Sequence, residues 1–123
     1  MKAAKAAERS LVNMPNNVFS LKVTSVSTVE IEDDVHGFAV GLKLYNGDNP
    51  DTNKYKVSID TENADLPMVG VDDYGRIVGI KTTENADDVF SINCTLEDSG
   101  ELAIGVQVSI DSIYGKKAGD VLD

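Results

Sequence analysis

The sequence predicts an all-β protein, an immunoglobulin-like antiparallel β-sandwich with a short N-terminal arm that is helical or extended. Apolar residues alternate with polar or small residues over four long stretches, at 38–44, 55–59, 90–96 and 102–110. This period of two is typical of strands with one buried face. Clusters of Asn, Asp and Gly separate the stretches, as turns require. No strand-like stretch is followed by a helix-like one, so a parallel sheet is not favoured.

Length and composition limit the classes of protein that this chain can belong to. Its 123 residues, of which 41% are hydrophobic, suffice for one domain and are too apolar for a wholly disordered chain. No apolar run approaches the roughly 20 residues needed to cross a bilayer, so we expect no membrane span. The 11 basic and 21 acidic residues give a net charge of −10. That sign is opposite to the footprint of a nucleic-acid-binding protein, so we expect no nucleic-acid partner.

The expected N-terminal arm, residues 1–17, differs in charge from the rest of the chain. Residues 1–14 hold three basic residues and one acidic residue, a net charge of +2, which leaves −12 for the remainder. Ala and apolar residues at helical spacing predict a helix over 3–14, which Pro15 ends. A helix this short is marginal by itself, since about 12–15 residues are a lower limit in water. We therefore expect the arm to dock on another protein through Lys2, Lys5, Arg9, Leu11 and Met14.

Residues 18–112 are expected to form the sandwich itself. Four shorter candidate strands join the four long ones and lie at 19–25, 28–32, 67–71 and 76–81. Turn chemistry occurs at 46–50, 72–75 and 97–100. Seven or eight short strands over roughly 95 residues match the dimensions of an antiparallel sandwich. Residues 113–123 are expected to form a C-terminal tail, because 114–119 are small and polar, and we expect a loop or an extended arm there.

The apolar face of each strand predicts the core. We expect the core to contain Val23, Val29, Ile31, Phe38, Val40, Leu42, Val57, Ile59, Val71, Ile77, Ile92, Cys94, Leu96, Ile104, Val106 and Val108. Cys94 is interpreted as a small buried residue, because a free cysteine packs like a hydrophobic side chain. As the single cysteine, it has no partner for an internal disulfide, which excludes a disulfide-stapled mini-domain.

Residues 71–80 predict a tight hairpin. Asp72 can accept a hydrogen bond from the backbone two residues on, and Gly75 can adopt a positive φ without steric cost. Gly79 allows another chain segment to approach closely. This arrangement resembles the bacterial immunoglobulin-like family Big2, which occurs in invasin- and intimin-like proteins and in many phage structural proteins.

The resemblance covers roughly residues 19–112 and extends from the hairpin through a strand, a charged turn and a final strand. Many members of the family carry a Trp in the strand before the hairpin, where this chain has Ile59. The resemblance implies an immunoglobulin-like domain without catalytic residues. Such domains serve as spacers, adhesive modules or decorations on larger assemblies, and this implication is an analogy from fold.

We therefore expect a non-enzymatic structural protein of a phage virion, namely an auxiliary capsid or decoration protein. The expected partner is the major capsid protein or another virion protein, and the expected location is the virion, assembled in the host cytoplasm. A basic, Ala-rich arm joined to an acidic domain motivates this expectation, and the arm lacks the apolar core of a signal peptide. The alternative is an adhesive module that binds a glycan or a host cell surface through exposed loops such as 46–53. The sequence leaves open whether the chain forms a homo-oligomer.

Catalytic, cofactor and metal sites are not expected. His36, the only histidine, lies between an acidic turn and a strand, and no G-x-S-x-G nucleophile motif accompanies it. One Cys and one His cannot supply four zinc ligands, and glycine-rich phosphate loops are absent from the sequence. Two acidic runs, at 30–34 and 46–53, offer the oxygen ligands that calcium prefers. Neither run has the spacing of an EF-hand loop, so we interpret both as solvated loops.

Overall fold

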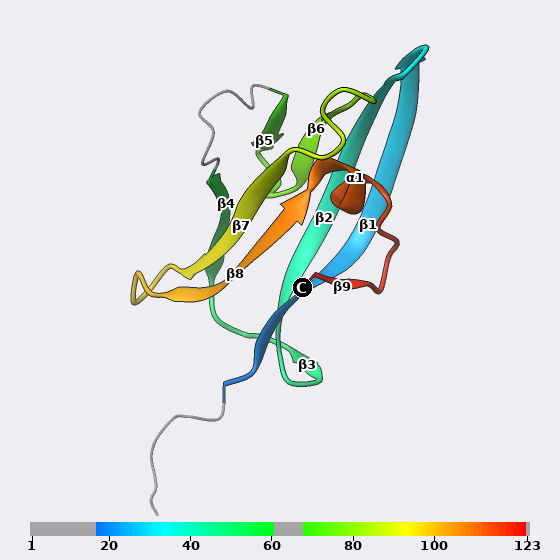
Figure 1. Ribbon diagram of the computed structural model, residues 1–123. Helices are drawn as coiled ribbons and strands as arrows, with labels where there is room; N and C mark the ends of the chain where they lie inside the picture. The colour runs from blue at the N-terminus through cyan, green and yellow to red at the C-terminus, as the bar shows by residue number, and fades with distance from the viewer. Residues whose placement is uncertain (1–16, 61–67, 123) are drawn as a thin grey trace, which may run out of the picture.

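Two antiparallel sheets pack face to face in the computed structural model, which describes residues 17–60 and 68–122 (Figure 1). In chain order the elements are β1 (Phe19–Glu32), β2 (Val35–Asn46), β3 (Asn49–Pro50), β4 (Tyr55–Asp60), β5 (Val69–Val71), β6 (Ile77–Lys81), β7 (Val89–Leu96), β8 (Leu102–Ser109), α1 (Ile110–Tyr114) and β9 (Val121–Leu122). The described helix, α1, is not long and apolar enough to cross a membrane.

The strand order is that of an immunoglobulin domain of the constant type. The larger sheet has the order β5-β6-β2-β1-β9, with β3 paired to β2, and the smaller sheet has the order β4-β7-β8. If β1, β2 and β4 to β8 are lettered A to G, the two sheets are D-E-B-A and C-F-G, the arrangement that defines this sandwich. The predicted immunoglobulin-like antiparallel sandwich is therefore confirmed.

The core lies between the two sheets, where alternate side chains of each strand meet. The buried apolar residues are Leu21, Val23, Phe38, Val40, Leu44, Val57, Ile77, Phe90, Ile92, Cys94, Val108, Ile110, Ile113 and Leu122. Eight of these were predicted from the sequence. Six further predicted residues are only partly buried and pack against this cluster: Leu42, Ile59, Val71, Leu96, Ile104 and Val106.

The prediction that Val29 and Ile31 belong to the core is wrong, since they are 59% and 56% exposed. The cause is a β-bulge in β1 between Val23 and Ser25, where the register with β2 shifts by one residue. Before the bulge Leu21 and Val23 face inward, whereas after it even-numbered residues do, as the pairing of Val26 with buried Val40 shows. An inserted residue moves every later side chain to the opposite face of the sheet.

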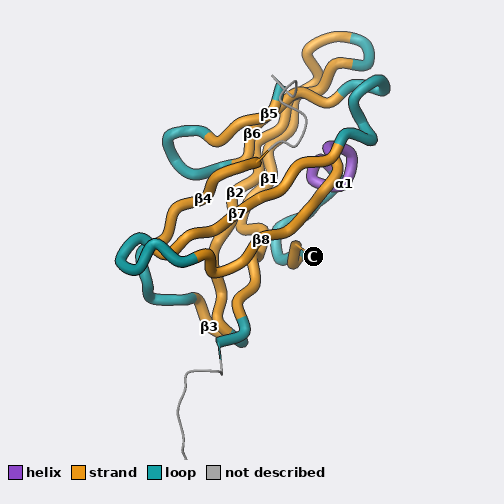
Figure 2. The backbone as a smooth tube through the Cα atoms, turned by 60° about the vertical axis from the view of Figure 1, so that its left-hand side comes forward, coloured by secondary structure: helices purple, strands orange, loops and turns teal. Residues whose placement is uncertain are grey.

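The same bulge joins two predicted strands, 19–25 and 28–32, into the single 14-residue strand β1. With β2 it forms a long hairpin that projects beyond the end of the smaller sheet (Figures 1 and 2). The predicted turns at 46–50, 72–75 and 97–100 are confirmed, and a glycine with positive φ lies in each. The prediction that a docking arm covers 1–17 falls, apart from Asn17, outside the described residues.

The chain end was predicted as a tail over 113–123, and this boundary is wrong. Ile110–Tyr114 form α1, capped by Ser109, whose side chain accepts a hydrogen bond from the Ser112 N–H at 3.1 Å. β9 then pairs with β1 through Leu122 opposite Leu21. Because Ile113 and Leu122 are buried, the sandwich domain extends to residue 122 instead of ending at 112.

Candidate functional site

The predicted partner-binding residues lie outside the described part of the chain. They are Lys2, Lys5, Arg9, Leu11 and Met14, all within residues 1–16. The docking role of the arm therefore stays a prediction from the sequence. The described residues, 17–60 and 68–122, offer three surfaces that bear on function: the turn and groove at β4 to β6, the end of the β1–β2 hairpin, and the outer face of the larger sheet.

The β5–β6 turn is organised by the carboxylate of Asp72, as the sequence predicted. Asp72 Oδ1 accepts hydrogen bonds from the backbone N–H groups of Tyr74 at 2.9 Å and Arg76 at 2.8 Å. Asp72 Oδ2 accepts one from Arg76 Nε at 2.7 Å. Gly75 takes a φ of 78° and donates its N–H to the Asp72 carbonyl. One side chain thus closes the turn, and Gly is required at the position with positive φ.

These contacts also set the charge state of the turn. Desolvation by itself would raise the pKa of Asp72, but hydrogen bonds from Arg76 and Tyr74 outweigh it and hold the pKa below its usual value of 3.8. The carboxylate is therefore ionised at neutral pH. It forms an ion pair with Arg76, whose guanidinium lies 5.4 Å from the centre of the Tyr74 ring.

Gly79 confirms the close approach that the sequence predicted. A Cβ atom at this position would lie 2.6 Å from the Met68 carbonyl oxygen and 2.7 Å from Phe38 Cζ. Real Cβ atoms essentially never come this close to backbone. The glycine therefore lets β5, β6 and the ring of Phe38 pack together on the inner face of the sheet.

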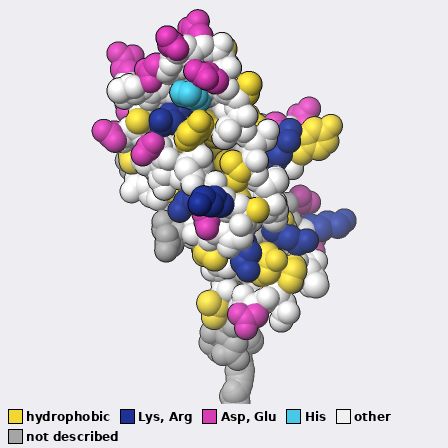
Figure 3. Space-filling model, turned by 90° about the vertical axis from the view of Figure 1, so that its right-hand side faces the viewer, with side chains coloured by type: hydrophobic (Ala, Val, Ile, Leu, Met, Phe, Trp, Pro, Cys, Tyr) yellow, Lys and Arg dark blue, Asp and Glu magenta, His cyan; other side chains and the backbone are white. Residues whose placement is uncertain are grey.

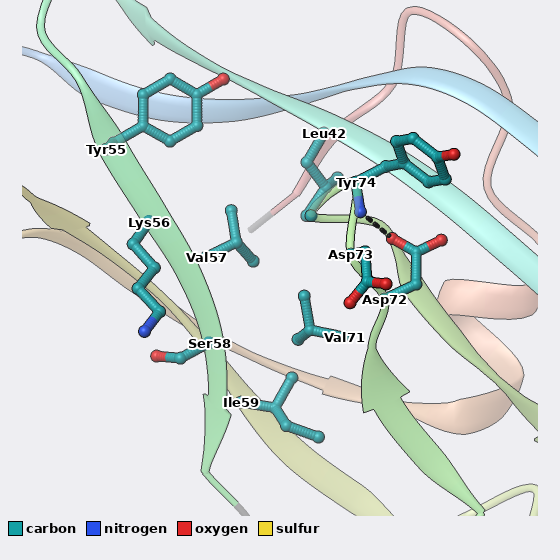
Figure 4. A pocket seen from close by; sticks show the side chains of 11 residues that line it. Leu42, Tyr55, Lys56, Val57, Ser58, Ile59, Val71, Asp72, Asp73 and Tyr74 are labelled. Atoms are coloured by element: carbon teal, nitrogen blue, oxygen red, sulfur yellow. Dashed lines mark hydrogen bonds between the residues drawn. The ribbon is translucent and has the colours of Figure 1, made fainter.

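A groove of about 650 Å³ opens between β4 and the β5–β6 turn (Figure 4). Tyr55, Val57 and Ile59 point from β4 into the space, whereas Lys56 and Ser58 point away from it. The β5–β6 turn supplies Asp73 and Tyr74 on the opposite side. The groove thus has an apolar floor and a rim of aromatic and acidic groups.

The rim of this groove has the chemistry that polar ring-shaped ligands use. Tyr74 is 84% exposed, so its ring, which has the Arg76 guanidinium 5.4 Å from its centre, still offers surface for stacking, and the carboxylate of Asp73 can accept hydrogen bonds from hydroxyl groups. The sequence assigned glycan binding to the loop 46–53 and missed this groove. Period-two alternation at 55–59 predicted the strand, but it does not say which turn lies opposite.

At the end of the β1–β2 hairpin, Asp34 ties the turn to the loop before β7. Its carboxylate accepts hydrogen bonds from the hydroxyl and the backbone N–H of Thr83. These bonds lower the pKa of Asp34. Nearby, the half-buried ring of His36 lies 5.8 Å from the ring of Tyr114, and Lys81 Nζ lies 5.0 Å from the centre of the same ring. The contacts of His36 are thus packing contacts with a neighbouring aromatic ring.

Cys94 is fully buried, which confirms its interpretation as a core residue. Burial raises the pKa of its thiol to about 11, and the charge of Asp51 acts in the same direction. A thiol held protonated in this way is a poor nucleophile and a poor metal ligand. Within 17–60 and 68–122, no three His, Cys, Asp or Glu side chains gather as a metal site would require.

The outer face of the larger sheet carries an apolar surface around Gly37. Val29, Gly37 and Ile80 pair in one row across β1, β2 and β6. A Cβ atom on Gly37 would lie 3.1 Å from Val29 Cγ1 and 3.5 Å from Ile31 Cδ1, so these side chains lean over the glycine. With Ala39 and Val78 they line a shallow depression of about 490 Å³. Exposed apolar residues that gather in this way, unlike scattered ones, are typical of interaction surfaces.

Over residues 17–60 and 68–122, the fold and these surfaces define the class of protein, an immunoglobulin-type β-sandwich with recesses at β4 to β6 and at Gly37, in a chain of acidic composition. No protein-family model, no curated protein and no solved structure matches the chain. The assignment of the class therefore rests on the strand order and register of the molecule itself.

Proposed function

We propose that this protein is a non-enzymatic structural component of a phage virion, an auxiliary capsid or decoration protein. In this proposal the sandwich is held on a capsid or other virion subunit by the arm, residues 1–17, through its basic and apolar side chains. The observation that carries the proposal is the β5–β6 hairpin. Its Asp72-centred turn and Gly75 have the geometry predicted for the stretch of sequence that resembles Big2, a family that occurs in many phage structural proteins, and that resemblance supports the proposal.

Several described side chains are of types that enzymes use in catalysis, and the contacts that each of them makes support a structural role. The thiol of Cys94 is buried in the core and has a raised pKa. His36 packs beside Tyr114. The lowered pKa values of Asp34 and Asp72 arise from structural hydrogen bonds: those of Asp72 close the β5–β6 turn, and those of Asp34 join the β1–β2 turn to Thr83 in the loop before β7.

Co-sedimentation with particles tests this proposal. The full chain and a variant lacking residues 2–14 are each expressed in a host in which the proposed virion assembles, and the particles are purified by gradient sedimentation. We expect the full chain in the particle fraction and the deletion variant in the soluble fraction. Lys43→Gln together with Lys54→Gln is the matched control, because it removes two positive charges from exposed positions of the sandwich and should leave attachment unchanged. Absence of the full chain from particles contradicts the proposal.

A second candidate function is adhesion to a glycan, which the groove beside Tyr74 favours. Because Tyr74 is 84% exposed, Tyr74→Ala should remove a stacking surface without unfolding the domain. Leu102→Ala, at a 59% exposed position on β8, is the control. The purified chain and both variants are tested on a glycan array. Binding that is lost in Tyr74→Ala and kept in Leu102→Ala would favour adhesion. Failure of the purified chain to bind any glycan would contradict it.

A further inference from the structure

Strand β1 has a free edge over more than half of its length. One side of β1 pairs with β2 from Phe19 to Glu32. On the other side β9 pairs only with Leu21 and Lys22, and Val23 bonds to the backbone of Gly119 and Asp120. From Ser25 to Glu32, no second strand among 17–60 and 68–122 pairs with β1. Such an edge presents unpaired N–H and C=O groups that can accept another strand.

The side chains of this edge favour strand pairing. Residues 25–29 read Ser-Val-Ser-Thr-Val, a β-branched and small set without Pro or charge. Val29 and Ile31 are 59% and 56% exposed and lie over the depression at Gly37. Proteins usually blunt exposed edges with charges, Pro or bulges. Here the charges are confined to the tip, at Glu30 and Glu32, and the register shifts lie at the two ends of the free segment, between Val23 and Ser25 and between Glu30 and Glu32, so the strand between them is regular.

The surface around this edge is complementary to itself in charge. Figure 3 views the molecule from the side of β1 and shows Asp and Glu gathered at the end that carries the hairpin, whereas most of the Lys and Arg lie lower down, among a few further Asp and Glu. Lys116 and Lys117 belong to the loop between α1 and β9, which bonds to β1 at Val23. A twofold axis through the middle of the free edge would bring the acidic tip of each copy toward the basic loop of the other.

We propose that the free edge of β1 pairs antiparallel with the same edge of a second copy of this chain, centred on Thr28. In this register Ser27 faces Val29, Ser25 faces Ile31 and Val26 faces Glu30, so no carboxylate faces another. The two residues of each pair are either both odd-numbered or both even-numbered, so their side chains lie on the same face of the joined sheet. The contact is isologous, which closes the assembly as a dimer. The larger sheets of both copies become one continuous sheet, and the apolar surfaces at Gly37 join across it.

Sedimentation velocity of the purified full chain at about 100 µM tests the dimer. We expect a species of twice the 13.2 kDa mass of one chain. Val29→Lys places a charge on the edge and should raise the Kd for dimerisation by at least about tenfold. Leu102→Lys is the matched control, since Leu102 is also 59% exposed but lies on β8, and it should leave the Kd unchanged. A monomeric full chain, or a dimer that Val29→Lys does not weaken, overturns the proposal.

The register has its own test. Thr28→Cys places two thiols opposite each other across the twofold axis, within the distance that a cross-strand disulfide spans. Cys94 is buried and does not compete. Under mild oxidation we expect a covalent dimer from Thr28→Cys and none from Ser99→Cys, at an exposed position in the β7–β8 turn. A dimer that does not cross-link through position 28 overturns the register. Neither measurement uses particles, so their outcome is separate from that of virion attachment.

Discussion

At the scale of single residues, the turn at Asp72 shows how one side chain decides local structure. Its carboxylate accepts three hydrogen bonds, two of them from backbone N–H groups that would otherwise have no partner. The sequence predicted this role, because Asx turns depend on a short-range pattern. Asp72 bonds to residues only two and four positions further along the chain, so the turn can be predicted without knowledge of the tertiary structure.

The lowered pKa of Asp72 predicts a dependence of stability on acid. Folding stabilises the ionised form of the Asp72 carboxyl, because its pKa in the folded chain is lower than in the unfolded chain, where it is near 3.8. The stabilisation is thus complete above the unfolded pKa and is lost as the pH falls through the lower folded pKa. We expect the Tm difference between the wild-type chain and Asp72→Ala to shrink between pH 6 and about pH 2.5, measured by circular dichroism. A Tm difference that stays constant over this range would contradict the prediction.

Gly79 supports a prediction about packing. Gly79→Ala drives a Cβ atom against the Met68 carbonyl and the Phe38 ring, and overpacking of this kind costs about 1–3 kcal/mol in free energy of unfolding. Gly70→Ala on the neighbouring strand β5 meets no atom within 4 Å and should change that free energy by less than about 0.5 kcal/mol. Urea denaturation of both variants checks the difference. Equal stabilities would show that the site relaxes without cost.

At the scale of elements, β1 illustrates where pattern reasoning fails. Its first half has an inward face at Leu21 and Val23, and its second half has an inward face at Val26. Two short strands were predicted here, at 19–25 and 28–32, and the alternation of apolar residues is interrupted between them. A bulge produces the same break in a continuous strand, and the partner strand β2 determines which of the two occurs.

The short strand β9 supports a prediction at this scale. Leu122 is 2% exposed and pairs opposite Leu21, so Leu122→Ala should leave a cavity and cost about 2–4 kcal/mol in free energy of unfolding. Val121 on the same strand is 44% exposed, and Val121→Ala should cost less than about 1 kcal/mol. Urea denaturation measures both. A neutral Leu122→Ala would mean that β9 does not belong to the core.

At the scale of the whole molecule, the two sheets and the chain end form one unit. α1 follows β8 directly, and its buried side chains, Ile110 and Ile113, join the cluster between the sheets. β9 then joins the larger sheet beside β1, at the edge away from β5. The C-terminal segment therefore completes the sandwich.

This closure predicts the limits of the folding unit. A chain of residues 17–112 loses Ile113 and Leu122 and should unfold at a clearly lower urea concentration than a chain of residues 17–123, or fail to fold. A chain of residues 17–123 should give a single cooperative transition by circular dichroism and by hydrogen exchange. Equal midpoints for the two chains would restore the predicted boundary at 112.

The sequence by itself determined the fold class, the long strands and the turns, because period-two alternation and Asn, Asp and Gly chemistry are local properties. It also determined eight of the fourteen buried apolar residues, since those follow the period-two alternation of their strand segments. The faces of Val29 and Ile31, the groove beside Tyr74 and the place of Leu122 were decided by tertiary structure alone. Each depends on which distant segment lies opposite, and partners far apart in the chain are chosen by the packing of the whole sandwich.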